Sequence, residues 1–223
     1  MNDASNVMQR VRRALGRGGE HTNGTLAAPP VPPPLPDAVV RLVQRGVDLP
    51  ALFAQRAGEM KMIVTQVSPD ALTAGVVDFV RGKPIQSVAL SDSPLIERLG
   101  VRAALEAAGV AVKSWNEISL DAMYEYDCAI TTVDYAVAES GTFVIKPSAS
   151  QGRSMSLVPM YHIAIIERGQ FLADMIDLFE LLATDPDRSN YVLISGPSKT
   201  ADIEMNVVTG VHGPNVVAAF VVE

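Results

Sequence analysis

Cysteine is nearly absent from this sequence of 223 residues, because Cys128 is its single thiol. One thiol excludes an internal disulfide, an iron–sulfur cluster held by this chain alone and a thiolate-rich zinc site. Cys128 lies in an apolar run that continues through Ala129 and Ile130, which favours a buried structural cysteine. If the protein takes part in redox metabolism, we therefore expect other proteins to carry the electrons and this chain to bind no cofactor of its own.

Charge is also scarce. Charged residues make up 19% of the chain, and the formal net charge is −7. Non-specific binding to nucleic acid depends on Lys and Arg neutralising phosphates, and anionic membranes attract basic segments. The negative balance therefore argues against both as partners. Hydrophobic residues reach 48%, which is enough for a large buried core.

The sequence contains no long apolar run. No stretch approaches the length of a membrane-spanning helix. The N-terminal stretch MNDASNVMQRVRRALG lacks the apolar segment and the cleavage pattern of a secretory signal. We therefore expect no membrane segment and a cytoplasmic location.

The N-terminus does contain a short, basic, amphipathic segment. Residues 5–15 predict a helix with apolar side chains on one face and arginines around the rest. These side chains are Val7, Met8, Val11 and Leu15 on the apolar face, and Arg10, Arg12, Arg13 and Arg17 elsewhere. This arm could pack on its own domain, pack on a second copy in a homodimer, or dock on a partner protein.

Residues 16–36 are rich in proline and glycine and end in APPVPPPLP. Prolines enforce an extended backbone, so this segment predicts a semi-rigid linker. The arm and linker therefore occupy residues 1–36, and a single α/β domain occupies residues 37–223.

The first part of that domain alternates between helical and strand patterns. It predicts helices at residues 37–46, 49–58, 68–81 and 93–108, and strands at residues 60–66, 85–91 and 110–115. Such alternation predicts a mostly parallel sheet with helices on both faces.

The second part predicts several strands with no helix between them. The strands are expected at residues 126–132, 142–146, 156–159, 162–167, 191–194 and 215–222, and the helices at residues 135–138, 170–183 and 201–205. Directly successive strands indicate that part of the sheet is antiparallel. The expected fold class is an open, mixed, mostly parallel α/β sheet flanked by helices.

Three polar loops flanked by apolar strands are the places where we expect chemistry, because ligands of open α/β sheets bind beyond the carboxyl ends of strands. The first loop is Glu139-Ser140-Gly141-Thr142. Glu139, beside a glycine on a sharp turn, could be a general base or a nucleophile. It could equally be a solvated turn residue.

The second loop spans residues 148–154 and contains Arg153. Its hydroxyls, glycine and planar guanidinium suit a carboxylate or phosphate, although it is neither a P-loop nor a dinucleotide-binding fingerprint. An ordinary connection between strands is the alternative. His162, further along, could titrate near neutrality or could be a structural histidine at a strand start.

The third loop spans residues 195–204 and predicts hydroxyls and a lysine at a helix N-terminus, which favours negative charge. Asp202 and Glu204 could instead be simple first-turn carboxylates. His212 follows on a glycine-proline turn. The chain has three histidines, and they make no metal site without carboxylates.

These loops supply all the predicted site residues. Glu139 is the catalytic candidate. The predicted ligand-binding residues are Ser140, Gly141, Thr142, Arg153, Ser156, His162, Ser195, Gly196, Ser198, Lys199, Thr200, Asp202, Glu204, His212 and Gly213.

At these loops the sequence resembles the lactate-utilisation protein C family, also called YkgG-like or LUD-domain proteins. The matching stretches are AVAESGTFVI, GRSMSLVPMYHIAII and LISGPSKTADIEMNVVTGVHGPNVVAAFVV. The resemblance implies a fold like that of the NagB/RpiA/CoA-transferase group. It also implies a role in the oxidation of L-lactate to pyruvate, beside partner proteins rich in iron–sulfur and cysteine motifs.

The wider group includes CoA transferases, which use a loop glutamate as nucleophile. Glu139 is placed similarly, but the motif around it differs, and Phe143, Lys146 and Pro147 depart from the pattern expected there.

Three hypotheses follow. The first is a lactate-oxidation subunit that binds a small anion or a nucleotide through residues such as Arg153 and Lys199. The second is a stand-alone enzyme that uses Glu139. The third is a non-catalytic assembly or regulatory subunit tethered by its arm.

Overall fold

The computed structural model describes residues 7, 10–11, 14, 41–43, 46–185, 190–201, 207–209 and 213–223. It divides the chain into two units, Met1–Pro36 and Asp37–Glu223. Residues 7, 10, 11 and 14, which belong to the predicted arm, are helical. The rest of that predicted helix and the predicted linker lie outside the described residues. None of the described helices is both long and apolar enough to cross a membrane.

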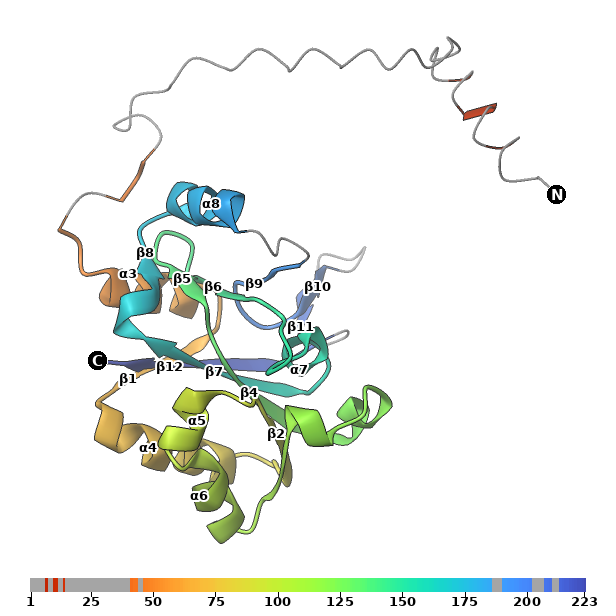
Figure 1. The fold of residues 1–223 in the computed structure, drawn as a ribbon. Coiled ribbons are helices and arrows are strands. Elements are labelled where there is room, and N and C mark those ends of the chain that lie inside the picture. Colours follow the sequence, from red (N-terminus) through yellow and green to blue (C-terminus); the bar gives the residue numbers. More distant parts are fainter. Residues whose placement is uncertain are drawn as a thin grey trace. The chain divides into compact units, whose positions relative to one another are not determined.

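A six-stranded sheet forms the centre of the second unit (Figure 1). Its neighbouring strands are, in order, β1 (Ile63–Val67), β12 (Val216–Val222), β7 (Tyr161–Glu167), β4 (Cys128–Thr132), β2 (Ser87–Leu90) and β3 (Ala111–Ser114). Every pairing in this sheet is parallel, which confirms the predicted fold class. Parallel sheets are buried on both faces, and the long strands β7 and β12 accordingly bury five consecutive residues each.

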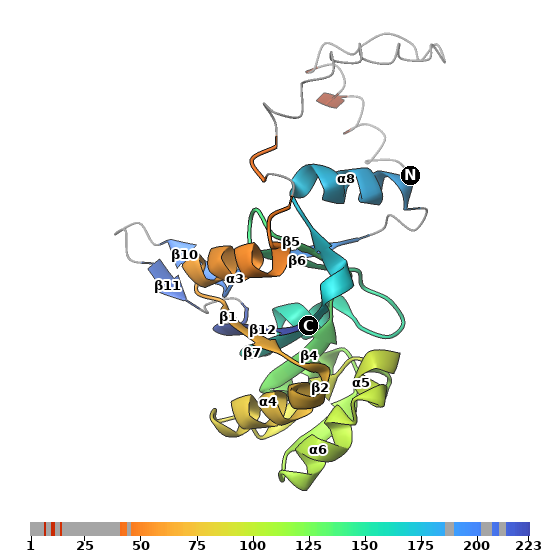
Figure 2. The same ribbon diagram turned by 90° about the vertical axis from the view of Figure 1, so that its left-hand side faces the viewer.

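Three helices cover one face of the sheet (Figure 2). They are α4 (Pro69–Arg81), α5 (Pro94–Arg98) and α6 (Val101–Ala107). Leu72, Val76 and Val80 recur every four residues along α4, so they form one apolar stripe that lies in the main buried cluster with the sheet. The sequence predicted one helix over residues 93–108. Two helices form instead, because Gly100 between them adopts a positive φ of 64°.

The opposite face carries a second, smaller sheet and α3 (Leu49–Glu59). The strands of the small sheet are, in order, β8 (Phe171–Leu172), β5 (Tyr135–Val137), β6 (Thr142–Ile145) and β9 (Val192–Ile194). Phe53 of α3 and Phe143 of β6 are fully buried in one cluster with Ala164 and Ala219 of the main sheet. The short helix α7 (Arg153–Leu157) also packs on this side, where Met155 contacts the cluster that contains Ala89 and Ala129.

The helix α8 (Met175–Thr184) covers the outer face of the small sheet, with Leu178 buried against Val137 and Val144. Arg41 forms ion pairs with Asp174 and Asp177 at the start of this helix. The remaining elements are the hairpin of β10 (Lys199–Ala201) and β11 (Val207–Thr209), and the 3₁₀ turns η1 (Trp115–Glu117), η2 (Asp121–Glu125) and η3 (Arg168–Gln170).

The predicted antiparallel strands exist, but they belong to the small sheet, where β6 pairs antiparallel with both β5 and β9. Several local predictions are wrong. Residues 135–137 form β5 rather than a helical turn, because pairing of Ala136 with Phe143 supplies backbone partners. Ser156 lies in α7 rather than in a strand, and α8 begins only after Asp174, whose carboxylate caps it. Residues 41–43 and 46 are not helical.

Candidate functional site

The first and third predicted loops meet through three hydroxyl groups. Ser140 Oγ donates to Thr142 Oγ1 at 2.8 Å, and Thr142 Oγ1 lies 2.7 Å from Ser195 Oγ. We call Ser140, Thr142 and Ser195 the hydroxyl chain. Thr142 is buried, whereas Ser195 is exposed at the end of β9. Three of the predicted ligand-binding residues therefore lie together, and they bond to one another.

Two glycines hold these loops against the end of α3. Gly141 has a φ of +61°, and a Cβ there would overlap the backbone nitrogen of Ala57. Gly196 has a φ of +133°, and a Cβ there would lie 2.7 Å from the carbonyl oxygen of Met60. Both positions need glycine for conformation and for close backbone approach. Their role is therefore to pack the loops on the helix.

The hydroxyl chain predicts a measurable contribution to stability. We expect Thr142→Val to lower the free energy of unfolding by about 1 kcal/mol, because it keeps the side-chain shape but removes two hydrogen bonds. Urea unfolding of the variant measures this change. Thr65→Val on the exposed surface of β1 is the control, and it should change stability by less than about 0.5 kcal/mol. Equal effects of the two variants would contradict a bonding role for Thr142.

Glu139 lines a shallow groove rather than the hydroxyl chain. The groove has a volume of about 350 Å³ and is lined by Leu42, Val43, Val47, Leu52, Arg56 and Glu139. The backbone nitrogen of Glu139 donates to Ala173. None of the other predicted site residues lines this groove among the described residues.

Arg153 and the third loop lie at opposite ends of α7. Arg153 is the first residue of this helix and is exposed. Ser198 donates its backbone N–H to Pro214, and a Cβ on Gly213 would lie 3.3 Å from Ser198 Cβ and 3.5 Å from the carbonyl oxygen of Leu157, the last residue of α7. The structure therefore does not bring Arg153 together with Ser198.

Ser156 is also turned inward. It is buried within α7, and its hydroxyl donates to the carbonyl oxygen of Arg153 in the preceding turn. This bond is internal to the helix, so Ser156 stabilises α7 rather than facing a ligand.

The predicted helix N-terminus in the third loop is wrong. Lys199, Thr200 and Ala201 form β10, which pairs antiparallel with β11. The hairpin supplies backbone partners that a helix would have left free, so residues 199–201 present no helix dipole to an anion. Lys199 is exposed. Asp202, Glu204 and His212 lie outside the described residues.

His162 is a structural histidine, which corrects the expectation that it titrates near neutrality. It is fully buried in β7, where its Nε2 lies 2.9 Å from Thr131 Oγ1 and its ring packs against Phe143. Burial disfavours the charged ring and lowers the pKa of His162 to about 3. The imidazole is therefore neutral at physiological pH, and its Nδ1 has no partner among the described residues.

Cys128 is likewise inaccessible. The side chain is fully buried in the main cluster, and burial raises the pKa of the thiol. The thiolate is the reactive form of cysteine, so this residue is inert. Within the described residues, no group of three His, Cys, Asp or Glu side chains could hold a metal ion.

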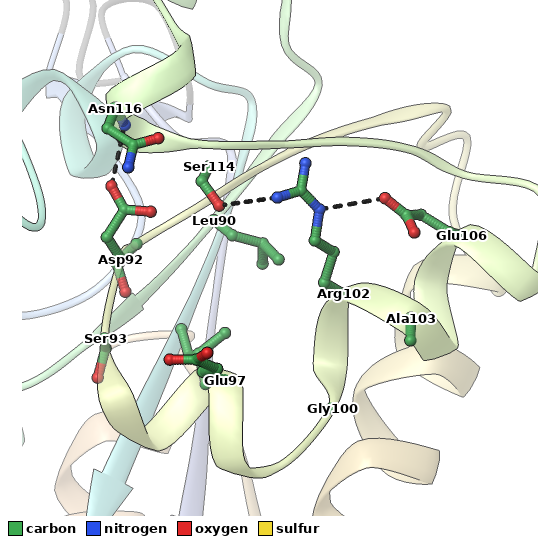
Figure 3. Close-up of a pocket in the computed structure, with 12 residues that line it drawn as sticks. Leu90, Asp92, Ser93, Glu97, Gly100, Arg102, Ala103, Glu106, Ser114 and Asn116 are labelled. Atoms are coloured by element: carbon green, nitrogen blue, oxygen red, sulfur yellow. Dashed lines mark hydrogen bonds and ion pairs between the residues drawn. The ribbon is translucent and has the colours of Figure 1, made fainter.

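The described part of the chain contains a larger cavity that the sequence analysis missed (Figure 3). We call it the carboxyl-end cavity. It has a volume of about 540 Å³ and is lined by Leu90, Ser91, Asp92, Ser93, Ile96, Glu97, Gly100, Arg102, Ala103, Glu106, Ser114 and Asn116. It lies beyond the carboxyl ends of β2 and β3, next to α5 and α6. The chain passes from β2 to β3 on one side and returns to β4 on the other, which is where α/β sheets bind ligands.

Asp92 is held rigidly at the rim of this cavity. Its backbone N–H donates to the carbonyl oxygen of Ser150, and its Oδ2 accepts from the backbone N–H of Asn116 at 2.9 Å. Next to it, Ser91 is buried, and its Oγ has no partner among the described residues. The cavity thus combines an oriented carboxylate with an unsatisfied hydroxyl.

The single arginine of the cavity is already engaged. Arg102 donates Nε to Glu106 at 3.1 Å, Nη2 to Glu117 at 2.8 Å and Nη1 to Ser114 Oγ at 3.3 Å. Its guanidinium therefore offers no open fork to an anion. Asp92, Glu97 and Glu106 outnumber Arg102, so the lining carries a net negative charge.

The second predicted loop borders this cavity through its backbone. Besides the contact of Ser150, Gln151 is buried and holds both backbone groups of Thr132 at the end of β4, with its Oε1 accepting from the N–H and its Nε2 donating to the carbonyl. A clear signal was present in the sequence, because the polar run Ser91-Asp92-Ser93-Pro94 directly follows an apolar strand.

Comparison with known proteins identifies the family. A sequence model of the LUD domain matches residues 51–222. Lactate utilization protein C of Halalkalibacterium halodurans is 35% identical over 181 residues, which cover 77% of this chain and 78% of that protein. The Bacillus subtilis protein of the same name is 34% identical, with 68% and 67% covered. The Escherichia coli protein YkgG is 30% identical, with 73% and 74% covered.

A solved structure shares the fold. The crystal structure of a DUF162 family protein from Deinococcus radiodurans matches with a TM-score of 0.60 at 20% identity, and the match covers 85% of this chain and 100% of that chain. The chain therefore belongs to the LUD domain family and, within it, to the lactate utilization protein C proteins.

Proposed function

We propose that this protein is a subunit of an L-lactate-oxidising system that works together with iron–sulfur and cysteine-rich partner proteins. The observation that carries the proposal is its family membership, since the relatives that match most of the chain are named lactate utilization protein C. Oxidation of L-lactate to pyruvate removes two electrons and two protons from the carbon that bears the hydroxyl. The proposal must therefore say where the electrons go.

The chemistry of this chain supports a division of labour. The one thiol is buried and protonated, so it does not exchange electrons. In the proposed system the iron–sulfur clusters of the partners accept the two electrons. This chain then contributes binding or assembly.

Two exposed cations support contact with a partner. Arg153 and Lys199 are exposed and form no ion pair among the described residues. Lys199 directly follows Ser198, which packs beside the last residue of α7, whereas Arg153 is the first residue of that helix. This separation fits an acidic partner surface better than a single small pocket, although the domain itself is acidic.

Growth on lactate tests the proposed role. We expect deletion of the gene to abolish growth of its host on L-lactate and to leave growth on pyruvate unchanged, because the block precedes pyruvate. Growth rates on the two carbon sources measure this. A plasmid copy should restore growth, and so should Cys128→Ala, because the thiol has no redox role. Undiminished growth of the deletion strain on L-lactate would contradict the proposal.

The role of the partners is tested separately. The tagged chain, purified from lactate-grown cells, should bring down proteins that contain iron and inorganic sulfide. The variant Glu139→Gln distinguishes a catalytic subunit from an assembly subunit. If the partners still bind but growth on L-lactate is lost, Glu139 takes part in the chemistry. If growth persists, Glu139 is an ordinary turn residue.

A further inference from the structure

We propose that the carboxyl-end cavity binds an uncharged ribonucleoside, with Asp92 accepting the ribose hydroxyls and the base lying on the apolar wall. This inference concerns a site that the lactate role does not assign, and it does not depend on that role. Four observations carry it: the position of the cavity, its charge, its free polar atoms and its apolar wall.

The position and size of the cavity suit a small organic ligand. Binding pockets for such ligands have volumes of about 300–1,000 Å³, and the cavity has about 540 Å³. It opens beyond the carboxyl ends of β2 and β3, on one side of the point where the strand order reverses. In open α/β sheets a carboxylate close to such a point characteristically binds ribose hydroxyls. Asp92 directly follows Ser91 and the end of β2.

The charge of the cavity disfavours anions. Three carboxylates line it against one guanidinium, and that guanidinium is bonded to Glu106, Glu117 and Ser114. A lactate carboxylate or a phosphate would meet like charge without an open donor fork. The loop after β2 also lacks the glycines that let a backbone approach a phosphate. The ligand is therefore a hydrogen-bond donor without negative charge.

The polar atoms left free ask for hydroxyl partners. Asn116 occupies Oδ2 of Asp92 and fixes the carboxylate plane, so Oδ1 is oriented in advance to accept from a ligand. The buried Ser91 Oγ, which belongs to the same lining, has no partner among the described residues. Buried polar groups are normally bonded, so an unpaired hydroxyl in a cavity wall indicates a missing partner. Vicinal hydroxyls of a ribose can satisfy both groups.

The remaining wall is apolar. Leu90, Ile96 and Ala103 belong to the lining. In Figure 3 the Leu90 side chain occupies the middle of the view, with Asp92 and Glu97 on one side of it and Arg102 on the other. A free sugar would leave this wall unused, whereas a planar base covers it and gains from burying apolar area. The pairing of a carboxylate with an apolar wall therefore points to a nucleoside.

Calorimetric titration of the full chain tests the proposal. The probes are adenosine, guanosine, cytidine and uridine, with 2′-deoxyadenosine, AMP, ribose, L-lactate and putrescine as comparisons. We expect at least one ribonucleoside to bind at least ten-fold more tightly than its 2′-deoxy form, its 5′-monophosphate at pH 8, or ribose. Amide NMR shifts should locate the bound molecule at Asp92, Ser93 and Asn116.

Two variants tie binding to the named groups. Asp92→Asn keeps an oxygen for Asn116 but loses the charge, and we expect it to weaken the nucleoside at least ten-fold. Ser91→Ala removes a hydroxyl that bonds to nothing in the described chain, so it should weaken binding without lowering the unfolding midpoint. Glu180→Gln, exposed on α8, is the matched control and should bind normally.

Several outcomes would overturn the inference. They are failure of all four ribonucleosides to bind, binding of L-lactate or AMP with equal or greater affinity, and tighter binding of putrescine, which would indicate an amine site. Unchanged affinity in Asp92→Asn, with circular dichroism showing an intact fold, would also overturn it. None of these results bears on the lactate growth test, so the two proposals can fail separately.

Discussion

Replacing Gly141 by alanine should lower the free energy of unfolding by about 3–4 kcal/mol, which would be the largest effect of any single methyl group added to this protein. Two costs add at this position. The φ of +61° is a left-handed conformation that residues with a Cβ rarely adopt, and the new Cβ would lie 2.7 Å from the carbonyl carbon of Arg56 and overlap Ala57 N. Both obstacles are backbone atoms of α3, and they cannot turn aside as a flexible side chain would.

The same substitution one turn away provides the control. Gly58 lies on the exposed surface of α3, and a Cβ there meets no atom within 4 Å. Because alanine favours helix by about 1 kcal/mol over glycine, Gly58→Ala should leave stability unchanged or raise it. Urea unfolding of both variants gives the comparison. Destabilisation of less than about 1 kcal/mol by Gly141→Ala would mean that the loop shifts away from α3 without cost.

The loop position of Gly141 also matters for Glu139 and the hydroxyl chain, which share its turn. A Gly141→Ala variant that still folds should therefore disturb the bond between Thr142 and Ser195. We expect its effect and that of Thr142→Val to be less than additive in the double variant, because both act on one packed unit.

Stability should also fall by about 2 kcal/mol between pH 7 and pH 5 because of His162 alone. Its pKa is about 3 in the folded protein against an ordinary value of 6.5. Below pH 6.5 the unfolded chain therefore binds a proton that the folded chain rejects. The stability is fully present above pH 6.5 and is lost progressively as the pH falls towards 3.

The variant His162→Gln isolates this contribution. The amide can still bond to Thr131 Oγ1, and it does not titrate, so its own packing cost is the same at every pH. Urea unfolding at pH 5, 6, 7 and 8 should show a steeper pH dependence in the parent chain than in the variant. Identical slopes would mean that His162 can be protonated in the folded state.

Other titrating groups are present in both proteins and cancel in this comparison. Burial raises the pKa of Asp134, so that carboxyl gains relative stability as the pH falls. Asp127 acts in the opposite direction, because hydrogen bonds from the backbone N–H groups of Gln86 and Ser87 and from the Ser87 hydroxyl outweigh its burial and lower its pKa. Only the difference between parent and variant assigns the effect to position 162.

Much of the architecture was predictable because local patterns control it. The apolar stripe of α4, the proline in its first turn and the apolar runs of β7 and β12 identify these elements without tertiary information. The small sheet was harder. The segment over residues 135–137 is too short to show a period, and only its pairing with β6 and β8 makes it a strand.

The site was only partly predictable. The polar loops of the C-terminal half were found from composition, and three of their hydroxyls do meet, but they bond to one another and pack on α3. His162 could not be distinguished from a titrating residue until its burial was known. The carboxyl-end cavity was overlooked because the search for polar loops after strands was confined to the second half of the domain.

By itself the sequence determined the family, the parallel character of the main sheet and the exclusion of thiol chemistry carried by several cysteines. These follow from residue identity and from periodicity along the chain. Only the tertiary structure decided which polar groups share a cavity, which are buried and which are already paired. The physical reason is that strand order and loop packing bring together residues far apart in sequence, and burial then sets their charge and their free hydrogen bonds.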